Sequence, residues 1–146
     1  MAFDALILEV EGVLFGISSS EVVQVVRAVA MNQIPNSPPS VEGAINVRGH
    51  VMPVLDLRYL TQLPRKELEL TDHLIVLRLP SREVAIRVDR AVDLVRLDET
   101  QLDQNSAMET PLVGRVAHTA HGFVHLLDWS RLLTPDTLST LTTVTM

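Results

Sequence analysis

The sequence contains no cysteine among its 146 residues, and it is poor in aromatic side chains. The missing cysteine excludes disulfide bridges, thiolate nucleophiles and thiolate metal ligands. One tryptophan, one tyrosine and three phenylalanines leave little material for the aromatic platforms on which single-stranded nucleic acids stack. The core must therefore be aliphatic, in line with a hydrophobic content of 47%.

Positive charge is also scarce. The chain has 12 Lys and Arg against 18 Asp and Glu, a formal net charge of −6. Because this charge repels a phosphate backbone, we expect no nucleic acid partner. No apolar run approaches the roughly 18 to 20 residues that span a bilayer, and the first residues lack the basic start of a signal peptide. We expect a cytoplasmic protein with no direct membrane insertion.

Short apolar segments that alternate with polar residues predict an all-β fold with short helices. A tight turn at Glu11-Gly12 joins the first two strands, a loop with three prolines covers 32–40, and Asp56 is placed to cap a helix through Leu60. The expected strands are 6–10, 13–17, 22–29, 43–47 and 51–55.

An internal repeat with a period of about 70 residues relates the two halves of the chain. Phe15–Arg27 aligns without a gap on Val84–Arg96, and Val54-Leu-Asp56 matches Leu126-Leu-Asp128. About five short strands per half are too few to cover both faces of an open sheet, so closure into a small barrel would remove the edges. We predict two barrels that share one core.

The repeat also predicts the domain organisation. We expect residues 1–146 to form a single domain with a first barrel half at 4–62 and a second at 72–133. The charged stretch 64–71 fits a linker between the halves. Residues 134–146 are rich in threonine and are expected to form a polar tail.

Polar residues that occur in only one half are the better functional candidates, because the fold itself does not require them. Asp56 and Asp128 are shared and are expected to cap short helices. Arg48 and Asn46 are not shared: the matching turn reads Thr119-Ala-His-Gly122 and offers no arginine. A solvated turn residue is the alternative interpretation of Arg48.

The segment that contains Arg48 resembles the signature of a known family. Gly43-Ala-Ile-Asn-Val-Arg-Gly49, followed by Val51-Met-Pro-Val-Leu-Asp-Leu-Arg58, is similar to the signature segment of the CheW-like family. The resemblance covers roughly residues 4–133 and implies two SH3-like, five-stranded barrels around a common core. It is reinforced by Val22–Arg27, Pro35, Pro38, Val88-Asp89 and Leu126-Leu-Asp128.

The resemblance implies a non-enzymatic adaptor without cofactor, metal or catalytic residues. Such adaptors bind the regulatory domain of a CheA-type histidine kinase and the cytoplasmic tip of a methyl-accepting chemoreceptor, with weak self-association possible in arrays. By position, Gln24, Asn46 and Arg48 fall at the kinase and receptor contact. Gln24 stands where many members have a glutamate that interacts with the arginine. A glutamine still accepts a hydrogen bond but carries no charge, so we expect it to affect partner choice.

The receptor groove of the family lies between the two barrels. By position we place Val22, Gly43, Ala85 and Val88 near it. Aliphatic residues on strands are more often core residues than contacts, so a core position is the alternative for each of them.

Two other functions remain open. The same features fit an adaptor of a non-flagellar chemosensory circuit, such as surface motility or second-messenger control. A metal site at His118, His121 and His125 is a candidate of another class, but no Asp or Glu lies within this sequence cluster to complete it. We predict no metal site.

Overall fold

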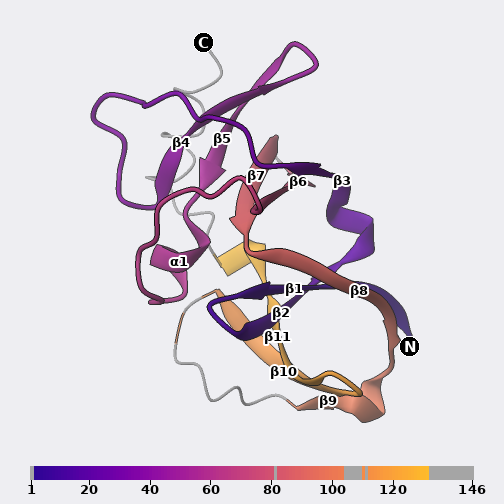
Figure 1. Cartoon of the computed structure of the whole chain (residues 1–146). Coiled ribbons are helices and arrows are strands. Elements are labelled where there is room, and N and C mark those ends of the chain that lie inside the picture. Colours follow the sequence, from indigo (N-terminus) through magenta and orange to yellow (C-terminus); the bar gives the residue numbers. More distant parts are fainter. Residues whose placement is uncertain (1, 81, 104–109, 111, 132–146) are drawn as a thin grey trace.

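The computed structural model describes residues 2–80, 82–103, 110 and 112–131, and the expected tail at 134–146 lies outside them. The described chain is almost entirely β, which confirms the predicted fold class (Figure 1). None of its helices is long and apolar enough to cross a bilayer. The strands are β1 (Phe3–Val10), β2 (Val13–Ser18), β3 (Val22–Arg27), β4 (Val41–Val47), β5 (His50–Leu55), β6 (His73–Arg78), β7 (Glu83–Val88), β8 (Arg90–Leu97), β9 (Leu102–Asp103), β10 (Val113–Thr119) and β11 (Gly122–Leu127). The helices are α1 (Leu57–Leu60) and the 3-10 turns η1 (Ser19–Glu21), η2 (Glu99–Gln101) and η3 (Trp129–Arg131).

The strands form two sheets that exchange hairpins. The six-stranded sheet has the order β8-β1-β2-β11-β10-β9, and the five-stranded sheet has the order β3-β6-β7-β5-β4. The hairpin β1–β2 therefore lies among strands of the second half, and β6–β7 lies among strands of the first (Figure 1). As a result, the repeat halves 4–62 and 72–133 do not correspond one to one with the sheets.

Each exchanged hairpin pairs antiparallel with one neighbouring strand, β1 with β8 and β6 with β3, and parallel with the other. The two parallel pairs are equivalent under the repeat. Leu126 of β11 pairs with Gly16 of β2, and Val54 of β5 pairs with Ala85 of β7. Leu126 matches Val54 and Gly16 matches Ala85 in the repeat alignment. The repeat thus extends from the sequence to the pairing between the halves.

One continuous stretch of chain joins the two edges of each sheet. Beyond β3 the chain reaches β4, where Asn32 and Ala44 exchange two backbone hydrogen bonds of 2.9 Å. In the other sheet, β8 continues through η2 into β9, which pairs with β10. These connections protect the exposed edges that small open sheets would otherwise present.

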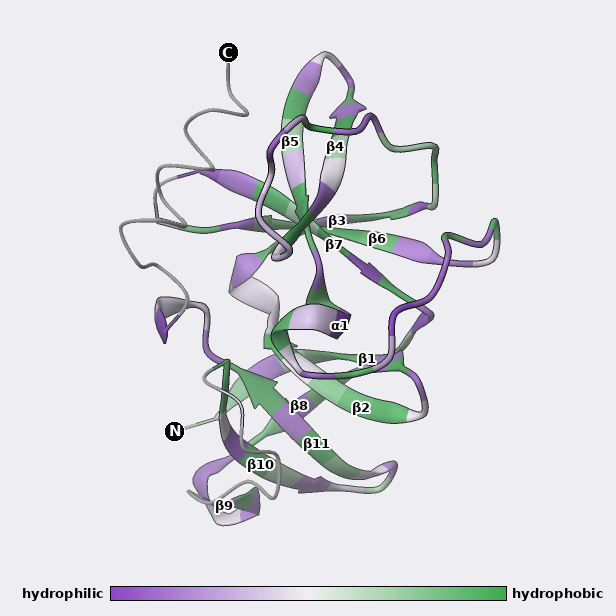
Figure 2. Ribbon diagram, turned by 90° about the vertical axis from the view of Figure 1, so that its left-hand side faces the viewer, coloured by the Kyte–Doolittle hydropathy of each residue, from purple (hydrophilic) through white to green (hydrophobic). Residues whose placement is uncertain are grey.

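The core has three parts, one within each sheet and one between them. Neighbouring residues of a strand contribute to different parts, as with Ile7 and Leu8 of β1. Because both faces of the central strands are buried, these strands read as continuous apolar runs. Figure 2 shows apolar segments of β1 and β2 beside α1, where the two sheets meet. The part between the sheets includes Leu8, Phe15, Leu57, Ile75, Ile86 and Trp129.

The close approach of β2 and β11 requires a glycine at position 16. A Cβ built on Gly16 would lie 2.8 Å from Leu126 Cδ2 and 2.9 Å from Val124 Cγ1, and both side chains are buried. The equivalent residue Ala85 carries a Cβ that the five-stranded sheet accommodates. The two parallel pairs therefore share register but differ in packing.

We expect Gly16→Ala to lower the free energy of unfolding by about 1–3 kcal/mol, because the new methyl group overpacks the core against Leu126. Ala85→Gly, the matched change in the other sheet, removes one methyl group and should cost only about 0.5–1 kcal/mol. Urea denaturation of both variants measures the difference. An unchanged or more stable Gly16→Ala protein would contradict the packing described here.

Candidate functional site

The turn between β4 and β5 presents Arg48 to solvent. Val47 pairs with His50, so Arg48 and Gly49 are the two turn residues. Their φ angles of 52° and 86° are both left-handed, as in a type I′ turn. Arg48 is exposed, and its guanidinium forms no hydrogen bond or ion pair with any described residue. The structure thus leaves a free cation at the hairpin tip.

Asn46 lies beside this turn and is bonded to it. Its side-chain Oδ1 accepts a hydrogen bond of 2.8 Å from the backbone N–H of Gly49. Asn46 is itself exposed on β4. The structure therefore joins Asn46 to the turn that carries Arg48.

Gln24 is not joined to Arg48. It lies half-buried on β3, opposite Val76 of β6, and no hydrogen bond links it to Arg48 in the described structure. Its neighbours Val23 and Val25 point the other way and are 38% and 41% exposed. The exposed apolar face of β3 thus consists of residues that the sequence analysis did not single out.

The four residues placed near a groove have different surroundings. Ala85 and Val88 are 0% and 1% exposed and lie in the core, so this placement does not support a contact role for them. Gly43 is also buried, and a Cβ there would lie 2.8 Å from the carbonyl oxygen of Asn32. Only Val22 keeps some exposed surface, while it packs against the core between the sheets.

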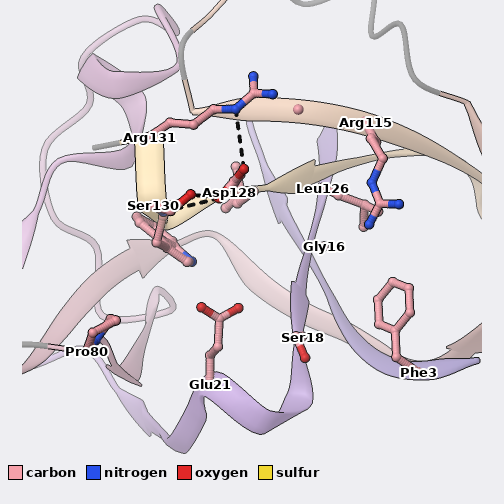
Figure 3. Close-up of a pocket in the computed structure, with 13 residues that line it drawn as sticks. Phe3, Gly16, Ser18, Glu21, Pro80, Arg115, Leu126, Asp128, Ser130 and Arg131 are labelled. Atoms are coloured by element: carbon pink, nitrogen blue, oxygen red, sulfur yellow. Dashed lines mark hydrogen bonds and ion pairs between the residues drawn. The ribbon is translucent and has the colours of Figure 1, made fainter. Parts of the chain in front are cut away.

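A hollow of about 620 Å³ opens beside the six-stranded sheet, where strand residues of that sheet, Glu21 of η1, the turn η3 and Pro80 line it (Figure 3). Glu21 of η1 points into it from one side, and Phe3 and Arg115 lie across from it (Figure 3). Asp128 accepts a hydrogen bond of 2.6 Å from the Ser130 hydroxyl and lies 3.3 Å from Arg131 Nε. Burial, and then the nearby charge of Asp128, raise the pKa of the Glu21 carboxyl. The hollow thus carries both signs of charge.

The three histidines considered as metal ligands make separate contacts. His121 Nε2 lies 2.9 Å from Asp93 Oδ2, an acidic partner that comes from β8 and so from outside the sequence cluster. His118 packs edge-on against Phe123 with ring centroids 4.8 Å apart, and His125 lies near Phe15. Over the described ranges, no group of three His, Asp or Glu side chains is arranged to hold a metal ion.

Arg87 is a buried cation that the sequence analysis missed. It is 5% exposed and contacts Glu42 at 2.8 Å and Asp72 at 3.0 Å, with further hydrogen bonds to the carbonyls of Lys66 and Glu67. Burial opposes the charge of the guanidinium, but the two carboxylates outweigh it and raise the pKa of Arg87. The linker is thus tied to β7. The position of an arginine within the otherwise apolar strand β7 was the sequence signal that could have indicated a buried, ion-paired cation.

Arg58 of α1 forms the second buried cluster. It is 4% exposed, and its guanidinium contacts Glu11 at 2.7 Å and Asp89 at 2.8 Å. It also donates a hydrogen bond of 3.0 Å to the carbonyl of Pro64. The residue closes the segment that resembles a family signature, but its burial was not apparent from the sequence.

Comparisons with known proteins agree on one family. The CheW-like domain matches residues 4–136 of this chain. The chemotaxis protein CheW of Bacillus subtilis is 30% identical over 98 residues, which are 67% of this chain and 63% of that protein. The chemotaxis protein CheW of Thermotoga maritima is 30% identical over 101 residues, 69% of this chain and 66% of that protein. The chain thus matches slightly less than two thirds of the length of these relatives.

A solved structure has the same fold. The scaffolding protein TtCheW from Thermoanaerobacter tengcongensis superposes with a TM-score of 0.79, covering 88% of this chain and 90% of the other. The sequence identity in this match is 22%, so the match establishes the fold alone.

We expect Arg87→Met to lower the free energy of unfolding by about 3–5 kcal/mol, because it leaves the carboxylates of Asp72 and Glu42 buried without a counter-charge. The control is Arg90→Met, which removes an exposed arginine paired with Glu9 and should change stability little. Chemical denaturation compares the two variants. A small effect of Arg87→Met would show that the cluster does not stabilise the fold.

The hydrogen bond from His121 lowers the pKa of the Asp93 carboxyl below its ordinary value of 3.8. A carboxyl group whose pKa is lower in the folded than in the unfolded state stabilises the fold at pH values above its unfolded-state pKa. This stabilisation is lost as the pH falls through the folded-state pKa. We expect His121→Ala to raise the pKa of Asp93 in an NMR titration. Asp98, whose pKa is lowered by Thr100, is the internal control and should not move. An Asp93 pKa unaffected by the substitution would exclude the pairing.

Proposed function

The chain belongs to the CheW-like family, and on this premise we propose that it is a non-enzymatic adaptor of bacterial chemosensory signalling. It couples chemoreceptors to a CheA-type histidine kinase in the cytoplasm. The match over residues 4–136, which includes the Arg48 turn, carries the proposal. The names of the relatives, chemotaxis protein and scaffolding protein, support the same function.

The Arg48 turn is the proposed kinase contact. A guanidinium forms short, charge-assisted and often bidentate hydrogen bonds with carboxylates, so a free one at a hairpin tip suits an acidic patch on a partner. Val51, which follows the turn on β5, is 48% exposed and adds apolar surface. Arginine is among the residues that are enriched in protein interfaces.

The receptor tip is proposed to bind at the junction of the two sheets. Of the four positions assigned to this contact, Val22 retains accessible surface there. The next residue, Val23, points to the opposite face of β3, where it is 38% exposed. Gln24 lies in sequence between Val22 and the Arg48 turn. Its side chain is neutral, so unlike a glutamate it forms no ion pair with Arg48, and the guanidinium stays available to a partner.

Binding of the regulatory domain of the CheA-type kinase from the same organism tests the proposal. We expect micromolar affinity by calorimetry, roughly −8 kcal/mol for an adaptor interface of standard size. Arg48→Glu should weaken binding about tenfold or more, because it reverses the charge offered to the partner. The matched control Arg65→Glu reverses an exposed charge in the linker and should leave the affinity nearly unchanged.

Circular dichroism and thermal unfolding show whether Arg48→Glu remains folded, as expected for an exposed turn residue. If the folded wild-type protein binds neither the kinase domain nor the receptor tip, the coupling function is excluded for this chain.

A further inference from the structure

We propose that Asn46 is a positioning residue, which selects the left-handed turn that presents Arg48 and does not itself contact the partner. The inference rests on the proposed function, because it describes how the same binding surface is built. It also revises the sequence-based expectation that Asn46 is a contact residue.

The left-handed turn needs a stabilising interaction because its first residue, Arg48, is not glycine. Arg48 has a φ of 52°, a region that side chains with a Cβ disfavour, whereas Gly49 adopts its φ of 86° without strain. The N–H of Gly49, the second turn residue, donates a hydrogen bond of 2.8 Å to Oδ1 of Asn46 on β4. This bond holds the amide that lies next to Arg48, and so it favours the left-handed backbone.

The turn between β1 and β2 follows the same rule. Glu11 has a φ of 54° and is followed by Gly12 at 76°. There the N–H of Glu11 donates to Asp89 Oδ2 at 2.9 Å. Among the hairpin turns that are described in full, the two that have a left-handed residue with a side chain at the first position, Glu11 and Arg48, each have one amide held by a side-chain acceptor.

The hairpin that matches Arg48 in the repeat closes differently. Neither Ala120 nor His121 has a positive φ, and the left-handed residue is Gly122, at 113°. The Thr119 hydroxyl accepts a hydrogen bond of 3.1 Å from the His121 N–H and donates one of 2.9 Å to the Gly122 carbonyl. Because this fold accepts two kinds of turn at equivalent hairpins, the hairpin frame alone does not fix the direction of residue 48.

The acceptor oxygen of Asn46 is already occupied by Gly49. A partner bonded to the second lone pair of this oxygen would share it with the Gly49 amide and so would weaken the bond that holds the turn. The side chain therefore serves the surface best by acting through Arg48. If Asn46 acts through Arg48, removing its side chain lowers the affinity for the partner only when Arg48 is present.

A double-mutant cycle on the full chain tests this dependence. Asn46→Ala, Arg48→Ala and the double variant are compared with the wild type for binding of the kinase regulatory domain. We expect Asn46→Ala to weaken binding roughly fivefold in the wild-type background and less than about twofold in the Arg48→Ala background. Asn46→Asp keeps the acceptor oxygen but adds a charge beside Arg48, so it serves as a control for the turn in hydrogen exchange and not for affinity.

Amide hydrogen exchange of Gly49 supplies a readout that does not depend on any partner. Exchange should be slow in the wild type and in Asn46→Asp, and about tenfold faster in Asn46→Ala, because the amide loses its acceptor. Thr119→Val is the matched control in the other hairpin. It should accelerate exchange at His121 and leave both Gly49 and kinase binding unchanged.

The two assays separate the failure of the inference from that of the proposed function. Equal losses of affinity for Asn46→Ala in both backgrounds would show that Asn46 contacts the partner directly and would overturn the inference. Unchanged exchange at Gly49 would also overturn it, while kinase binding by the wild type would leave the proposed function in place. If the wild type binds neither kinase nor receptor, both the proposed function and the role of Asn46 in presenting Arg48 to a partner are excluded. This holds even if hydrogen exchange shows that Asn46 stabilises the turn.

Discussion

The buried guanidinium of Arg58 is the interaction on which the arrangement of the two sheets depends. It reaches Glu11 in the β1–β2 turn of one sheet and Asp89 at the end of β7, which belongs to the other. Asp89 in turn accepts from the Glu11 N–H, and its own N–H donates to the carbonyl of Glu9. Hydrogen bonds to the charged groups raise the pKa of Arg58 despite its burial, so the cation is present at any physiological pH.

This cluster explains how two small sheets behave as one unit. Each exchanges a hairpin with the other half, and the apolar core between them is contributed by both. Arg87 adds a second tie, because it binds the linker carbonyls of Lys66 and Glu67 while it pairs with Glu42 and Asp72. A fixed arrangement of the two sheets suits the proposed adaptor function, in which the relative placement of the bound partners would carry the signal. The Arg48 turn is then an exposed feature on a fixed frame.

The sequence was sufficient for the features that repeat or that follow local rules. The all-β class, the turn at Arg48-Gly49 and the cap at Asp56, which accepts from the Tyr59 N–H, were all predicted correctly. The exchange of hairpins between the two halves was not predicted. The sequence repeat has the same period whether or not the halves exchange hairpins, so it cannot distinguish the two arrangements. Ala85 was placed near the receptor groove only by position in the family, with a core position as the alternative, and the structure leaves it 0% exposed. Contacts distant in sequence, such as Asp93 with His121, leave no local pattern either.

The central claim is that this rigid two-sheet unit offers the Arg48 turn to a kinase. The most direct measurement is NMR mapping of the isotope-labelled chain with the unlabelled regulatory domain of the CheA-type kinase. The account predicts the largest shifts on and beside the turn, at residues 46–51, with the core amides of β6 and β7 unchanged. Binding that leaves 46–51 unperturbed and shifts only the β10–β11 end would contradict it.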